Sequence, residues 1–127
     1  MKKVMVFGTY DILHKGHIHF FDQARKYGDY LIVVVARSKN VQKIKGKFPR
    51  RSECRRIAEI TSYAEKVVLG SSRKGYSAIK RYNPDIICLG YDQEADIKEL
   101  KRFNIPIKRL RPFKPHLYKS SKMKINS

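Results

Sequence analysis

Short apolar runs of strand length recur along the chain and alternate with stretches whose apolar residues are spaced as on one face of a helix. The runs are rich in β-branched residues and almost uninterrupted, which is typical of parallel strands buried on both faces. They cover residues 4–7, 30–36, 67–69 and 86–89, with a weaker run at 105–107. The pattern therefore predicts about five strands.

Helical spacing appears between these runs. Ile18, Phe21 and Ala24 share one helix face, and Gly28 is the expected C-terminal cap of that helix. A second helix is expected to begin after Ser52, whose hydroxyl suits an N-cap. Two shorter helices are predicted at 76–82, stopped by Asn83 and the proline after it, and at 94–103.

Alternating strands and helices predict an α/β fold: a Rossmann-like open parallel sheet of about five strands with helices on both faces. The length of 127 residues suits one domain, so we expect a single domain over 1–127. Ligands of such sheets bind beyond the carboxyl ends of the strands. The loops after the first, second, third and fourth strands are therefore the expected ligand-binding loops.

Charge narrows the choice of partners. The chain holds 29 Lys and Arg against 11 Asp and Glu, a net charge of +18, which favours anionic ligands. Basic residues concentrate between Arg37 and Arg56 and again between Lys98 and Lys124, although a solvated surface is the plain alternative for any one of them. No apolar run reaches membrane-spanning length, and the two cysteines lack metal-knuckle or redox spacing, so we expect a cytoplasmic protein.

The loop after the first strand carries the clearest candidate chemistry. Residues 8–17 match neither the Walker pattern nor the glycine pattern of dinucleotide folds. Instead, His14 and His17 lie three apart with Gly16 between them, at the start of a helix whose N-terminus favours an anion. Imidazoles there can stabilise charge on a transferring phosphoryl group. A transition-metal site including His19 and a chance occurrence are the alternatives; the spacing is not that of a zincin.

These residues resemble the signature of a known family. Gly8-Thr9-Tyr10-Asp11 followed by His14-Lys15-Gly16-His17 is similar to the signature of the cytidylyltransferase-like nucleotidyltransferases. The resemblance implies that the two histidines stabilise the transition state. It also implies nucleotide contacts from Thr9, Tyr10, His14, Lys15, Gly16 and His17, while Asp11 either belongs to the site or braces the loop.

Later segments extend the resemblance. The basic stretch after the second strand and the Glu-x-Arg helix imply phosphate contacts from Lys45 and Arg55, and Gly90-Tyr91-Asp92 resembles the family's Gly-x-Asp, which places Asp92 by the nucleotide. Near the end only Ser120 and Ser121, with the lysine after them, align with the family's phosphate-binding segment. Tyr118 is a candidate to stack on the acceptor substrate.

Within the family, the run 33–37 and the Lys-Gly-Lys-x-Pro stretch most resemble archaeal FAD synthase, which adenylylates FMN. The resemblance implies ATP and FMN as partners, Mg²⁺ carried with the nucleotide, no metal ligands in the chain, and a homodimer. Two alternatives stay open. One is a CTP-dependent cytidylyltransferase for glycerol-3-phosphate or another polyol or sugar phosphate; the other, from a different class, is a basic nucleic-acid-binding module.

Overall fold

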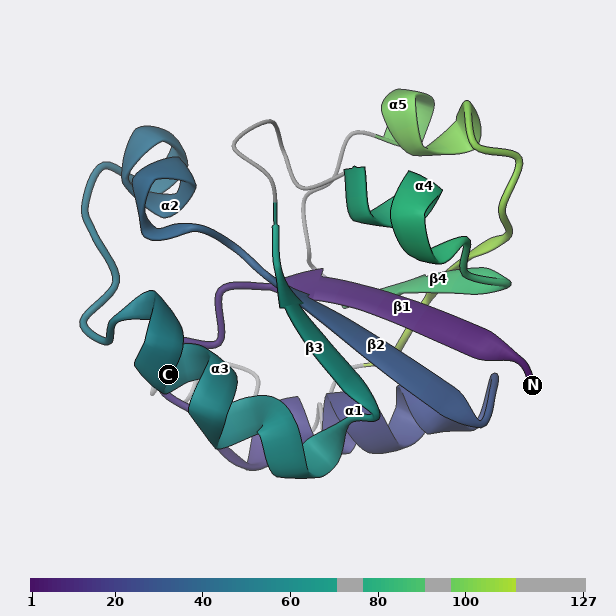
Figure 1. Cartoon of the computed structure of the whole chain (residues 1–127), viewed down its shortest axis with the longest axis horizontal. Coiled ribbons are helices and arrows are strands. Elements are labelled where there is room, and N and C mark those ends of the chain that lie inside the picture. Colours follow the sequence, from purple (N-terminus) through teal and green to yellow (C-terminus); the bar gives the residue numbers. More distant parts are fainter. Residues whose placement is uncertain (71–76, 91–96, 112–127) are drawn as a thin grey trace.

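The computed structural model describes residues 1–70, 77–90 and 97–111 (Figure 1). Four of the residues expected at the site, Asp92, Tyr118, Ser120 and Ser121, lie outside the described residues.

Five strands form one fully parallel sheet in the order β3-β2-β1-β4-β5. The chain starts in the centre, winds outward to one side through β2 and β3, and then crosses to the other side through β4 and β5. The α/β prediction is confirmed, and the order of strands switches direction beside β1. The strands are β1 (Lys3–Gly8), β2 (Tyr30–Val35), β3 (Lys66–Leu69), β4 (Ile86–Leu89) and β5 (Ile107–Arg109).

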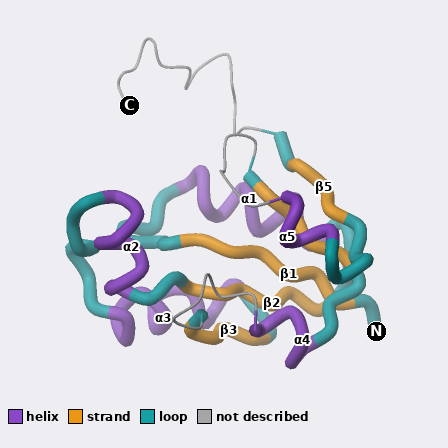
Figure 2. Tube along the Cα trace, turned by 90° about the horizontal axis from the view of Figure 1, so that it is seen from above, coloured by secondary structure: helices purple, strands orange, loops and turns teal. Residues whose placement is uncertain are grey.

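Helices cover both faces of this sheet (Figure 1). The helices α1 and α3 pack on one face and α4 and α5 on the other, whereas α2 lies beyond the carboxyl ends of β1 and β2, as Figure 2 also shows. Within the described residues, no helix is both long and apolar enough to cross a membrane. The helices are α1 (Lys15–Arg25), α2 (Ser38–Lys45), α3 (Glu53–Ile60), α4 (Ser77–Tyr82) and α5 (Ile97–Lys101), and a 3-10 turn at Thr61–Tyr63 follows α3.

Two apolar clusters hold the layers together. On β1, Val4 and Val6 face α1 and α3, while Met5 between them faces α4 and α5. All three side chains are fully buried. Burial of a side chain of this size contributes about 1.5–3 kcal/mol, so a central strand gains from both faces. This explains why the strands read as continuous apolar runs.

Three local features differ from the sequence-based expectation. The helix α2 was not predicted, because only Val41 of its eight residues is buried and so it shows no apolar stripe. The strand β5 begins at Ile107, two residues later than the apolar run indicated. Gly28 does not cap α1, which ends at Arg25 with Lys26 as C-cap. A Cβ on Gly28 would lie 2.6 Å from the backbone oxygen of Lys2, so this glycine permits a close chain approach.

Candidate active site

The two histidines of the first loop are built into the start of α1. His14 is the N-cap residue, and its Nδ1 accepts a hydrogen bond from the backbone N–H of Gly16 at 3.0 Å. The Nδ1 of His17 in turn accepts from the backbone N–H of His14 at 3.3 Å. This is a capping box in which imidazoles replace the usual hydroxyl and carboxylate. Both rings are therefore fixed by backbone that the helix itself supplies.

The capping bonds also set which ring nitrogen carries the proton. A ring nitrogen that accepts a hydrogen bond carries no hydrogen, so the neutral form of each histidine has its proton on Nε2. The rings stack with centroids 4.0 Å apart at an interplanar angle of 23°. Burial, followed by the charge of His14, lowers the pKa of His17 to about 4. Near neutral pH, His17 is an uncharged hydrogen-bond donor.

Gly16 is required by the position of the His14 ring. A Cβ at residue 16 would lie 2.8 Å from Cε1 of His14 and 3.0 Å from its Nδ1, inside van der Waals contact. The helix start is thus tight because the ring folds back over it. The glycine between the two histidines makes room for an imidazole in addition to exposing backbone N–H groups.

Tyr10 packs against the His17 ring from the core side. Its side chain is only 6% exposed, and its ring packs edge-on against His17, with centroids 5.4 Å apart, and against Phe21. The backbone of Tyr10 has φ of 52°, and a Cβ on Gly8 would lie 2.5 Å from the tyrosine ring. Its hydroxyl has no hydrogen-bond partner among the described residues, and burial raises the pKa of that hydroxyl. The ring therefore lies beneath His17 in the core.

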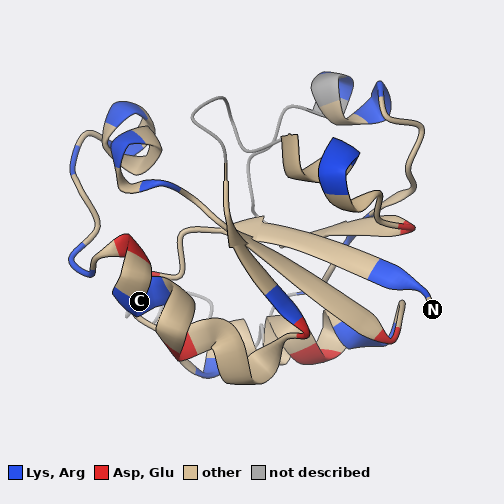
Figure 3. Cartoon of the chain, viewed as in Figure 1, with Lys and Arg blue, Asp and Glu red and all other residues tan. Residues whose placement is uncertain are grey.

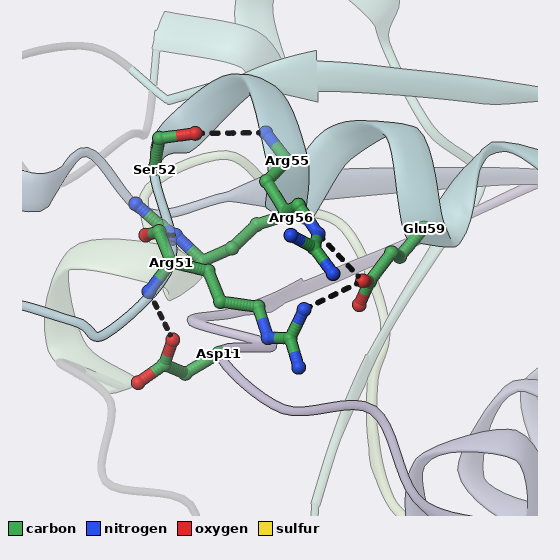
Figure 4. A network of polar contacts seen from close by, with 6 residues as sticks. All are labelled: Asp11, Arg51, Ser52, Arg55, Arg56 and Glu59. Atoms are coloured by element: carbon green, nitrogen blue, oxygen red, sulfur yellow. Dashed lines mark hydrogen bonds and ion pairs between the residues drawn. The ribbon is translucent and has the colours of Figure 1, made fainter.

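The histidine loop is the segment from Thr9 to His14 that joins β1 to α1. Asp11 ties this loop to the turn that precedes α3. Its carboxylate accepts hydrogen bonds from the backbone N–H groups of Arg50 at 2.8 Å and Arg51 at 2.9 Å. Figure 4 shows the second of these bonds. The bond from Arg50, followed by the bond from Arg51 and the charge of Arg56, lowers the carboxyl pKa. Of the two roles that the sequence left open for Asp11, these contacts correspond to bracing the loop.

Lys45 and Thr9 meet at the same end of the sheet. The helix α2 ends at Lys45, where Gly46 adopts the left-handed conformation with φ of 86°. The Nζ of Lys45 lies 3.4 Å from the Thr9 hydroxyl, at the edge of hydrogen-bond distance, and the lysine is exposed. Lys15, the first residue of α1, is exposed as well. The structure thus brings Lys45, expected to contact phosphate, to the histidine loop.

Arg55 occupies a different position. Its side chain is 62% exposed and pairs with Glu59 at 3.1 Å, and Arg51 binds the same carboxylate oxygen at 2.9 Å (Figure 4). An open hollow is lined there by Ile12, Arg50, Arg51, Ser52 and Arg55. Ser52 caps α3 as expected, by accepting from the Arg55 N–H at 3.1 Å. No described contact joins Arg55 to the histidines.

The neighbouring Arg56 was missed from the sequence. It is fully buried, and its guanidinium donates to backbone oxygens of Thr9 and Ala36 and to the Ser38 hydroxyl. One signal was available: Arg56 and Ile60 are four residues apart, so they share the face of α3 that packs on the sheet.

Figure 3 shows Lys and Arg spread over α2 and the loop that follows it. Nine of the 29 basic residues fall between Arg37 and Arg56, beside the histidine loop. A stretch of this kind attracts polyanions to the carboxyl edge of the sheet. Among the described residues, no group of three or more His, Cys, Asp or Glu is placed to hold a metal ion.

Comparison with known proteins places this geometry in a family. The family model described as cytidylyltransferase-like matches residues 5–124. The chain belongs to this family. The resemblance drawn from the histidine signature is confirmed, and with it the class of nucleotidyltransferases.

Curated relatives of this cytidylyltransferase-like chain carry the name FAD synthase. The protein of Pyrococcus horikoshii is 39% identical over 96% of this chain and 86% of its own length, and that of Thermococcus sibiricus is 40% identical over 93% and 83%. The protein of Ferroglobus placidus is 41% identical over 80% of this chain, and the match spans 66% of its length, just under two thirds.

Solved structures agree with the fold. A lipopolysaccharide core biosynthesis protein from Thermoplasma volcanium superposes with a TM-score of 0.76 at 38% identity, over 89% of this chain and 97% of that one. Pantoate-beta-alanine ligase from Francisella tularensis has a TM-score of 0.59 over 98% of this chain and 68% of its own. Its 15% identity supports a shared fold alone.

Proposed function

We propose that this nucleotidyltransferase transfers AMP from ATP to FMN, producing FAD and pyrophosphate. One observation above all supports the chemistry. The stacked imidazoles of His14 and His17 lie at a helix N-terminus, and the Nδ1 of each accepts a hydrogen bond from a backbone N–H. The identity of the substrates is supported by the FAD synthases to which the chain is similar at about 40% identity over most of its length.

In this reaction an oxygen of the FMN phosphate attacks the α-phosphorus of ATP. The new P–O bond forms as the bond to the β-phosphate oxygen breaks, and pyrophosphate departs with the electron pair. The second pKa of such a phosphate is about 6, so the attacking oxygen is already ionised near neutral pH and no general base is needed. Catalysis then depends on positioning and on charge stabilisation.

The roles of individual residues follow from their places. The Nε2–H groups of His14 and His17 would donate to the α-phosphate oxygens, where charge develops, together with the N-terminus of α1. Lys45, beside Thr9, would contact a phosphate as a mobile point charge. Nucleotide contacts from Lys15, Gly16 and Asp92, and contacts with the acceptor substrate from Arg55, Tyr118, Ser120 and Ser121, remain predictions.

Magnesium would enter with the nucleotide. The described residues offer no cluster of three ligands for a resident cation. Mg²⁺ commonly binds through substrate phosphates with few protein ligands, so an ion carried by ATP would need few or no ligands from this chain. When bound, the ion would neutralise charge on the departing pyrophosphate.

Direct assay of the product tests this proposal. The protein is incubated with Mg²⁺ and FMN together with either ATP or CTP, and FAD and pyrophosphate are quantified by chromatography and a coupled assay. We expect FAD and pyrophosphate in equal amounts with ATP. His14→Ala and His17→Ala should each lower turnover by about 10²–10³-fold while the protein stays folded. A variant that retained most of its turnover would contradict the assigned role.

A second candidate keeps the chemistry and changes the acceptor substrate. The Thermoplasma volcanium structure, named as a lipopolysaccharide core biosynthesis protein, covers nearly the same length. This favours testing sugar and polyol phosphates, including glycerol-3-phosphate with CTP. Pyrophosphate release with one of these and none with FMN would establish this second candidate instead.

A binding module is distinguished by the same assay. If no acceptor substrate releases pyrophosphate and nucleic acid binds tightly at physiological salt, the enzymatic proposal fails.

We further propose a homodimer, which light scattering of the purified protein tests. Both cysteines, Cys54 and Cys88, are free, which supports our expectation of a reducing, cytoplasmic setting.

A further inference from the structure

Arg56 lies where three separate segments of the chain meet behind the histidine loop. Its Nη1 donates to the backbone oxygen of Thr9 at 2.9 Å and to that of Ala36 at 2.8 Å. Its Nη2 donates to the Ser38 hydroxyl at 3.0 Å, and its Nε to the backbone oxygen of Arg51 at 3.2 Å. One side chain thus joins the loop after β1, the start of α2 and the turn before α3.

The chemistry of these contacts is unusual for a buried cation. Arg56 is 0% exposed and takes part in none of the ion pairs between described side chains. Its four hydrogen bonds to described residues go to uncharged oxygens, and the charges of Glu53 and Asp11 act on it without an ion-pair contact. Burying a guanidinium without a carboxylate in contact is costly, and an apolar side chain often stabilises a core as well. The contacts of Arg56 are directed at the backbone of the site loops, since two of them go to the backbone oxygens of Thr9 and Ala36.

Geometry supplies the explanation. The segments joined by Arg56 carry the groups that must act together: the histidine loop begins at Thr9, and α2 begins at Ser38 and ends at Lys45. The Nζ of Lys45 approaches the Thr9 hydroxyl only to 3.4 Å, which is too long to fix the separation of α2 and the histidine loop. Arg56 contacts the backbone of Thr9 directly, and its planar fork holds both segments in a fixed geometry.

We propose that Arg56 is a positioning residue that holds the histidine loop and α2 in the separation needed for transfer to the acceptor substrate. It acts through Thr9, Ala36 and Ser38 and does not contact substrate itself. This inference rests on the proposed function, because it assumes that His14, His17 and Lys45 act on one reaction centre.

The test uses Arg56→Lys and Arg56→Gln. Lysine keeps the charge but cannot make the forked contacts, and glutamine removes the charge. A misplacement of about 1 Å can cost roughly 10²-fold in rate, so we expect kcat of the folded Lys variant to fall by about 100-fold and that of the Gln variant further. kcat and kcat/KM for ATP should fall together, because the lost interaction acts in the transition state.

A matched control is available at the opposite edge of the sheet. Arg25 donates to Glu65 at 3.1 Å and to the backbone oxygen of Tyr63 at 3.0 Å, far from the carboxyl ends of the strands. Arg25→Lys and Arg25→Gln should lower the melting temperature and leave kcat unchanged. If a folded Arg56 variant kept the wild-type kcat while its melting temperature fell, its role would be structural alone and the proposal would be overturned.

The proposal can still be tested if the Arg56 variants do not fold. If both Arg56 variants fail to fold, Ser38→Ala decides, because it removes the hydroxyl that accepts from Nη2. A several-fold lower kcat in folded Ser38→Ala supports the proposal, and an unchanged kcat overturns it.

Wild-type protein is assayed first with FMN and with sugar phosphates. Absence of FAD there defeats the proposed function, whereas the Arg56 comparison can still be made with whichever acceptor substrate reacts.

Discussion

Replacing Gly16 by alanine separates activity from stability in this fold. The new Cβ would lie 2.8 Å from Cε1 of His14, whereas ordinary contact begins at about 3.4 Å, so the ring must retreat by about 0.6 Å. That movement breaks or stretches the 3.0 Å bond between Nδ1 of His14 and the Gly16 N–H. It also shifts the stacked ring of His17. Displacement on this scale can reduce turnover by about 10²-fold.

Stability should change little in the same variant. Loss of the capping bond costs about 1 kcal/mol, and the higher helix propensity of alanine returns up to about 1 kcal/mol. We therefore expect the free energy of unfolding to stay within about 1 kcal/mol of wild type. FAD formation measures the first effect, and urea unfolding followed by circular dichroism measures the second.

Gly28→Ala is the matched control, and we expect it to lower stability while kcat stays unchanged. Its Cβ would lie 2.6 Å from the backbone oxygen of Lys2, at the amino ends of the strands and away from the histidines. Backbone must move there, which costs about 1–3 kcal/mol, while kcat of the folded protein should stay near wild type. A Gly16→Ala variant with kcat within about threefold of wild type would refute the argument that the His14 ring needs this space.

Three further predictions concern single side chains. The pKa of His17 is lowered to about 4 in the folded protein, so between about pH 6.5 and pH 4 the unfolded chain binds one more proton than the folded protein. The free energy of unfolding should therefore fall as the pH drops through that window. An NMR titration in which His17 titrated near its usual pKa of about 6.5 would contradict this prediction. Tyr10→Phe removes a buried hydroxyl that has no partner among the described residues, so unfolding should cost the same or about 1 kcal/mol more; a clear loss of stability would show that the hydroxyl is bonded. Lys45→Gln should raise KM about tenfold with the fold intact, since one phosphate contact is lost; unchanged kinetic constants would remove Lys45 from the site.

The larger part of the fold follows from local patterns. Continuous apolar runs on strands buried on both faces, such as 86–89, appear directly in the sequence, and β4 has those bounds. The helix that Ser52 begins was likewise predictable, since its cap is a local hydrogen bond. The histidine pair was identified because capping boxes and tight helix starts depend only on residues close together in the chain. The helix α2 left no such pattern, because it buries only Val41.

Tertiary structure decided the roles of residues that look alike in the sequence. Arg55 and Arg56 are adjacent and chemically identical, yet one is 62% exposed at a hollow and the other is fully buried beneath the site loops. Which of them enters the core depends on the face that α3 turns toward the sheet, and that face is fixed by packing against distant strands. Likewise, Asp11 became a brace only because residues 50 and 51 pass beside it. Local sequence thus determined the elements and the histidine pair, whereas long-range packing determined which charges hold that pair in place.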